Sequence, residues 1–351
     1  MNLFQPLVEN IRIPAFFNPA LLLLAVFLIP AAFGHVPVIP VGNDALSEAT
    51  VVSDPAKSWA FYGHLKEAGE VQYYRFDATE GERILVSLYA SADPEEQDFL
   101  PDLVLMGPGI ESQGELAVPV EVPEGAGVMV LEGRQPERVT YEPFGPSSFR
   151  SLGSIDMEAP SSGTYRVAVY DPERGGHYGF TVGYIETFSV QERITTPIRL
   201  ISVYRWSGES LALIFAPVAA VLLMGILLIR KKARDLDVSG QLGSLAGLLF
   251  FATGSSIFFQ MALSLARAPE FSEVPITLLL AFIPILLGTG ALAISLGSGP
   301  KVKDRIGLLF VGMIGIVVGA GFLAGPLMAI AAGLILPKRC ALECAPIVGK
   351  T

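Results

Sequence analysis

Four long apolar runs in the second half of the chain constrain its fold more than any other feature. They cover 211–229, 242–266, 274–296 and 306–336, and each has the ~20 residues that a helix needs to cross a bilayer core. Only 17% of the 351 residues are charged, against about a quarter in soluble globular chains. We therefore expect a transmembrane bundle of about four helices over 211–337, followed by a tail at 338–351.

The last of these runs is longer than one upright span requires, and Gly325-Pro326 divides it. The piece that follows the proline is too short to return across the bilayer. We therefore expect one tilted or kinked span over 306–336 rather than a hairpin.

The first 34 residues have the layout of a signal peptide. Arg12 precedes a largely apolar run from Pro14 to Phe33, and Ala32 and Gly34 supply small residues where a signal peptidase reads the chain. This pattern predicts a signal peptide over 1–34 that is cleaved before His35, with an uncleaved anchor helix as the alternative. In either case the region that follows is exported.

Loop charges give an independent prediction of topology. The loops at 230–234 and 301–305 are rich in Lys and Arg, whereas the loop at 267–273 is not. The positive-inside rule makes the two basic loops cytoplasmic. The sequence therefore predicts a multi-pass protein of the cell membrane, in contact with lipid, whose large N-terminal domain is extracytoplasmic.

The exported region is acidic and has the pattern of a β-protein. Residues 35–210 contain 12 Lys and Arg against 27 Asp and Glu, which argues against a nucleic-acid partner. Apolar residues alternate with others in stretches such as 165–170 and 177–184, and Gly- or Pro-containing turns separate the stretches. We expect an exported all-β sandwich, jelly-roll-like, over 35–185, followed by the α-helical transmembrane bundle.

Three segments of this region resemble a known family. They are Gly69–Asp77 with Glu80–Arg83, Pro101–Leu105, and Pro160–Val169. Their order is similar to that of the bacterial pre-peptidase C-terminal domain, over about residues 59–184. The resemblance implies a small secreted β-sandwich with a role in binding or secretion rather than catalysis. Members of that family usually accompany a catalytic domain, whereas here the companion is a membrane bundle of no recognised family.

Residues 186–210 connect the two regions. Apolar residues such as Ile194, Ile198 and Ile201 lie on one side of a helical projection, and Trp206 lies just before the first span. We expect an interfacial amphipathic connector. The alternative is an ordinary linker, because Pro197 disfavours a helix.

No catalytic signature in the sequence identifies this chain as an enzyme, although the sequence leaves enzyme activity open. The metalloprotease, hydrolase, nucleotide-binding and EF-hand signatures are all absent. Gln260 stands out as polar within a span, where we expect it to bond a neighbouring helix. Our prediction is a membrane-anchored extracytoplasmic binding or accessory module, with a protein or polysaccharide ligand at the outer surface. The alternatives are a transport or channel component and a copper-binding or redox protein.

Two sets of residues are candidate metal ligands. If cleavage frees the amine of His35, that amine and the imidazole form a nitrogen chelate suited to copper, and His64 or His177 would complete the site. Carboxylates near one turn are candidate calcium ligands, although their spacing matches no dedicated calcium loop. These are Asp93, Glu95 and Asp98.

Overall fold

The structure is a computed structural model that describes residues 34–233, 236–269, 272–297 and 302–335. Residues 1–33, which hold almost all of the predicted signal segment, and the tail 338–351 lie outside the described residues. The chain divides into two compact units. A β-rich unit contains Ala32–Ile214 and Gln260–Pro275, and a helical unit contains Phe215–Phe259 and the chain from Ile276 onward.

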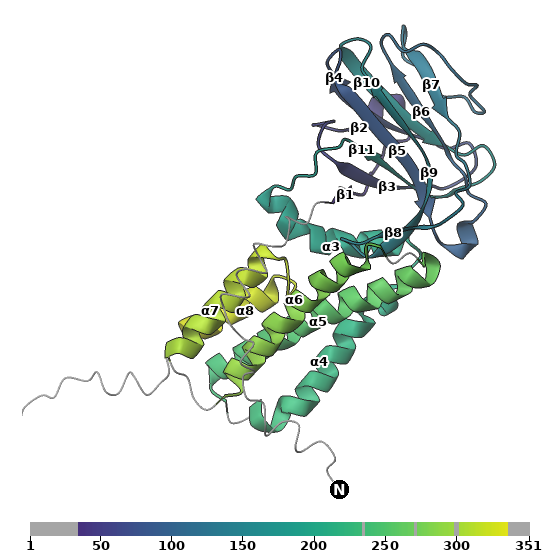
Figure 1. Cartoon of the computed structure of the whole chain (residues 1–351). Helices are drawn as coiled ribbons and strands as arrows, with labels where there is room; N and C mark the ends of the chain where they lie inside the picture. Colours follow the sequence, from purple (N-terminus) through teal and green to yellow (C-terminus); the bar gives the residue numbers. More distant parts are fainter. Residues whose placement is uncertain (1–33, 234–235, 270–271, 298–301, 336–351) are drawn as a thin grey trace, which may run out of the picture. The chain divides into compact units, whose positions relative to one another are not determined.

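Two sheets form the β-rich unit (Figure 1). The first has six strands in the order β1 (Val36–Val38), β3 (Trp59–Leu65), β11 (Gly176–Val182), β5 (Arg83–Ser91), β9 (Ser147–Glu158) and β8 (Thr140–Glu142). The second has five strands in the order β2 (Thr50–Val51), β4 (Val71–Ala78), β10 (Gly163–Tyr170), β6 (Asp102–Gly107) and β7 (Gly127–Leu131). The prediction of a β-region followed by a helical region is confirmed at this level.

One hydrophobic core takes its side chains from both sheets. Phe61 and Phe180 of the first sheet pack with Tyr74 and Val167 of the second, and none is more than 2% exposed. Phe61 and Phe180 stack with their ring centroids 4.8 Å apart. The period-two alternation of apolar residues along the strands directs these side chains to one face.

The second sheet is buried on its other face as well, which the alternation pattern did not indicate. Tyr73, Val104 and Ala168 form a separate apolar cluster with partly buried residues of the segment that follows β6. Tyr170 accepts a hydrogen bond from the backbone N–H of Ala117, and Tyr73 accepts one from that of Glu121. The long insert after Gly109 therefore covers this face.

The connector contains a helix, α3, at Val190–Trp206. The Ser189 side chain accepts from the backbone N–H of Glu192, and the Glu192 carboxylate accepts from that of Ser189. This reciprocal cap satisfies two N–H groups at the helix start. Pro197 lies inside the helix, so the alternative of a linker that proline breaks is wrong.

Three further helices are long and apolar enough to cross a membrane within the described residues. They are α4 (Leu211–Ala233), α5 (Val238–Arg267) and α6 (Val274–Ser295). Small residues pack in the interior of the helical unit. Ala246, Ala291 and Ala329 are fully buried there.

The fourth apolar run differs from its prediction as a single span. It forms two helices, α7 (Val302–Val317) and α8 (Ala324–Leu334). Gly312 lies against Ile330 and Pro326, and Gly333 lies against Leu309, so the two helices run antiparallel. Gly319 and Gly321 have positive φ in the turn between them, where glycine carries no steric penalty. The predicted division at Gly325-Pro326 is therefore displaced, because proline is tolerated in the first turn of α8.

Candidate functional site

Two histidines lie opposite each other on neighbouring strands of the first sheet. β3 and β11 are antiparallel, and their register pairs His64 with His177. The two imidazoles stack with centroids 4.2 Å apart and planes inclined by 17°. His64 is therefore a strand residue, and the register brings together two side chains that are far apart in the sequence.

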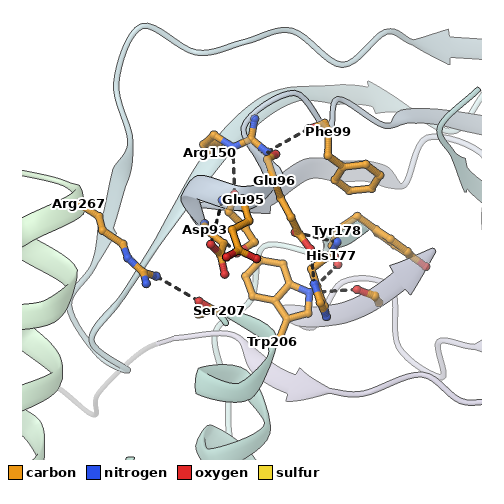
Figure 2. Close-up of polar contacts among 12 residues, drawn as sticks. Asp93, Glu95, Glu96, Phe99, Arg150, His177, Tyr178, Trp206, Ser207 and Arg267 are labelled. Carbon is orange, nitrogen blue, oxygen red and sulfur yellow. Dashed lines mark hydrogen bonds and ion pairs between the residues drawn. The ribbon is translucent and has the colours of Figure 1, made fainter. Parts of the chain in front are cut away.

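Glu96 holds His177 through both carboxylate oxygens (Figure 2). Oε1 lies 2.6 Å from His177 Nδ1, and Oε2 accepts from the backbone N–H of His177 at 3.0 Å. Glu96 lies in η2, the short 3-10 turn Pro94–Glu96 that follows β5. Burial raises the pKa of Glu96, but the hydrogen bonds and charge of His177 outweigh it and hold the pKa below its ordinary value.

Arg150 fixes the turn that carries Glu96. Arg150 is 3% exposed, and its guanidinium donates to the carbonyls of Ser91, Glu96, Gln97 and Phe99 at 2.7 to 3.0 Å. A fifth hydrogen bond goes to the side chain of Gln135. One buried cation thus satisfies four backbone acceptors of an irregular loop, which keeps the Glu96 carboxylate in place.

Trp206 anchors α3 beside the histidine pair. Its indole N–H donates to the carbonyls of Gly63 and Tyr178, both at 3.0 Å. These residues adjoin His64 and His177 in the sequence, and the indole ring packs edge-on to the His177 ring, with centroids 6.4 Å apart. Trp206 is 6% exposed. The same two strands therefore hold both the histidine pair and the end of α3.

A cleft with a volume of about 300 Å³ opens beside His64. Its lining residues are Ile39–Asp44, Tyr62–His64, Lys66, Glu70 and Gln72. The wall is fixed from within by buried hydrogen bonds. The Tyr178 hydroxyl donates to Gln72 Oε1 at 2.7 Å and lies 2.6 Å from the Tyr74 hydroxyl, while the Gln72 amide donates to His64 O and to Glu70.

His35 lies away from this pair. Its Nδ1 is hydrogen-bonded to the Ser58 hydroxyl, just before β3, and burial lowers its pKa. His64 is six residues further along, which is about 20 Å at ~3.3 Å per strand residue. The structure thus brings His64 and His177 together and does not bring His35 to them.

The candidate calcium ligands are also separate. Asp93 caps η2 by accepting from the backbone N–H of Glu95, and the Glu95 side chain is exposed. Asp98 pairs with Arg174 at 3.5 Å. Within the part of the chain that the structure describes, no group of three or more His, Cys, Asp or Glu side chains is placed to hold a metal ion. The three carboxylates therefore do not form a shared calcium cage there.

Sequence reasoning missed Glu96, Arg150 and Trp206 as parts of this site. Glu96 lies in the same charged turn as Asp93 and Glu95, but nothing in the sequence ties it to His177, which is 81 positions away. The strands at 59–65 and 176–182 carry His64 and His177. Pairing the two histidines from the sequence would have required knowledge of the strand register. Trp206 is placed by the sequence just before the first predicted span, whereas the structure shows that its indole N–H bonds the sheet.

The comparisons with known proteins add little. No family model matches the chain, and no curated protein matches it. One similar solved structure is PliG of Aeromonas hydrophila, a periplasmic inhibitor of g-type lysozyme. It is 16% identical, and the match covers 42% of this chain and 97% of that one with a TM-score of 0.24. The resemblance to the pre-peptidase C-terminal domain stays a prediction.

Proposed function

We propose that this protein is a membrane-anchored binding module whose β-rich unit is exported as a sandwich and holds a ligand at the outer surface of the cell membrane. The signal-like segment and the loop charges support export. Three helices of spanning length support a membrane anchor. The β-rich unit supplies the binding surface.

The cleft beside His64 is the observation that carries this proposal. Its polar lining includes Asp44, Lys66 and Glu70, and the exposed apolar side chains of Ile39 and Val41 border it. A wall held by buried tyrosines loses little conformational entropy when a ligand binds, which favours affinity.

The ligand that this lining favours is a segment of a partner protein. Apolar and charged groups alternate over a short distance, as in the core and rim of protein interfaces. The net charge of the surrounding acidic region favours a partner with basic residues, because complementary charge speeds association. A polysaccharide is the competing class.

Photo-crosslinking in native membranes tests the proposal. A photoreactive residue at Lys66 should give a discrete protein adduct, and one at Glu158, an exposed strand end, should not. Val41 is 88% exposed, so Val41→Arg should block the cleft without disturbing the core, and it should remove the adduct. Equal adducts from both positions, or an adduct that Val41→Arg leaves unchanged, would contradict the proposal. A carbohydrate adduct would reassign the ligand class.

A further inference from the structure

The pairing of His64 and His177 has the geometry of close cross-strand neighbours. The backbone N–H of His177 donates to Glu96, and the carbonyl of His64 accepts from Gln72. Neither group therefore forms a hydrogen bond between the two residues, and this is the pattern of a non-hydrogen-bonded antiparallel pair. Side chains at such pairs are the closest that a sheet offers, with Cβ atoms ~4.5–5.5 Å apart.

The carboxylate of Glu96 determines which nitrogen of His177 is available. It lies 2.6 Å from Nδ1 and leaves Nε2 without that partner. A histidine that donates one ring N–H to a carboxylate presents the other nitrogen as a lone pair of fixed direction. This arrangement recurs behind metal-binding histidines.

His64 supplies the second nitrogen. Its side chain is exposed, and within the described residues its ring makes no side-chain hydrogen bond. A metal ion needs both nitrogens at about 2.0–2.1 Å. The stacked rings must therefore open, and His64 is the ring free to turn.

We propose that His64 and His177 together bind one Cu(II) ion, with Glu96 as the residue that positions His177. Imidazole nitrogens favour Cu(II) over the other divalent first-row metals. Water or a ligand in the adjoining cleft fills the remaining coordination positions, because the described part of the chain has no group of three or more His, Cys, Asp or Glu side chains placed to hold a metal ion. Nearby Glu70 and Glu96 add negative charge.

This inference goes beyond the proposed binding function and does not depend on it. The two residues lie in the described β-rich unit, whatever side of the membrane that unit occupies. It also differs from the site that the sequence suggested, which was built on His35, because His35 and the mature N-terminus take no part in it.

Copper binding by the full-length, tag-free protein in detergent tests the inference, with Cu(II) alone as the probe. Equilibrium competition should give about one Cu(II) per chain, and pulsed electron paramagnetic resonance should show two coupled imidazoles. His64→Ala and His177→Ala should each weaken binding at least tenfold. Glu96→Gln should weaken binding about 10–100-fold, as removal of such carboxylates does.

His35→Ala is the matched control, because it removes a histidine of the same unit and should leave both affinity and spectrum unchanged. His64→Gln keeps a polar side chain at the exposed position, and an unchanged thermal transition in this variant separates lost binding from lost folding. Copper bound with unchanged affinity in the His64→Ala and His177→Ala double variant would overturn the proposal. So would binding that only His35→Ala abolishes. Neither result would affect the crosslinking from Lys66.

Discussion

The β-rich unit and the helical unit bury their interiors with different kinds of residue. The core of the β-rich unit is made of large side chains such as Tyr165 and Phe180, both completely buried. The helical unit brings backbones together at glycine and alanine, as at Gly247 and Gly288. Sheets separated by ~10 Å need long side chains to fill the space, whereas helices in a bilayer gain most from close backbone approach.

The buried polar groups that form the most specific hydrogen bonds belong to the β-rich unit. The β-rich unit contains a buried arginine and buried tyrosines, all of them hydrogen-bonded. The buried Gln260, near the end of α5, donates to Glu209 at 2.9 Å, and both residues belong to the β-rich unit. The sequence predicted that Gln260 bonds a neighbouring helix. Its partner is instead the carboxylate of Glu209, which lies between α3 and α4.

The largest expected effect concerns membrane topology, because we expect the β-rich unit to be exported. Single cysteines at Glu95 and at Lys232 should react differently with a membrane-impermeant thiol reagent on intact cells. Glu95, in an exposed turn, should label at once, and Lys232 only after permeabilisation. A chain with Cys340 and Cys344 replaced provides the background. Reversed labelling would contradict export of the β-rich unit.

Arg150→Leu should be the most destabilising change within the β-rich unit. It leaves four backbone carbonyls without their donor, and we expect a loss of about 3–5 kcal/mol from the free energy of unfolding. Urea unfolding of the purified chain, followed by tryptophan fluorescence, measures it. Arg83→Leu is the control, because the Arg83 pair with Asp156 is solvent-exposed and should contribute little. Equal effects of the two changes would contradict this interpretation.

Gly288→Val should disturb only the helical unit. A Cβ at Gly288 would lie 2.7 Å from the carbonyl oxygen of Gly247, so α5 and α6 must separate. Overpacking of this kind costs about 1–3 kcal/mol. Gly325→Ala is the milder match, since its Cβ would meet nothing closer than 3.3 Å. Thermal unfolding in detergent should show a lower transition temperature for Gly288→Val and not for Gly325→Ala. The β-rich unit should be unaffected in both variants.

The smallest effect concerns pH. Burial raises the pKa of Glu142 from 4.5 to about 7, and the charges of Glu273 and Glu186 act in the same direction. Because the folded chain holds this proton more tightly, the contribution to stability is full below about pH 4.5 and is lost as the pH rises through about 7.

Glu142→Gln removes the group that titrates and therefore removes this loss of stability at high pH. We expect the variant to be about 1 kcal/mol more stable than the native chain at pH 8 and little changed at pH 4. The gain is smaller than the pKa shift alone would give, because the Glu142 side chain is partly exposed and solvent screens its charge. Urea midpoints at the two pH values measure the difference. Glu158→Gln, at an exposed position, is the control. A gain at pH 4 equal to that at pH 8 would contradict titration of Glu142.

The sequence alone predicted the order of the two regions and the strands at 165–170 and 177–182, because period-two alternation and long apolar runs are local properties. It misjudged the run at 306–336, where Gly319 and Gly321 produce a turn that hydropathy does not detect. It also ended the exported domain at 185, whereas Trp206 binds the sheet through two carbonyls. That boundary depends on a contact between segments far apart in the chain.

The candidate site shows the same limit. Periodicity predicted that His177 lies on a strand, because side chains alternate in direction along a strand. Only the tertiary structure decided that His64 faces it, that Glu96 fixes its Nδ1, and that a cleft opens beside them. Register and loop placement arise from the packing of both faces of the sheets, so no single segment of sequence contains them.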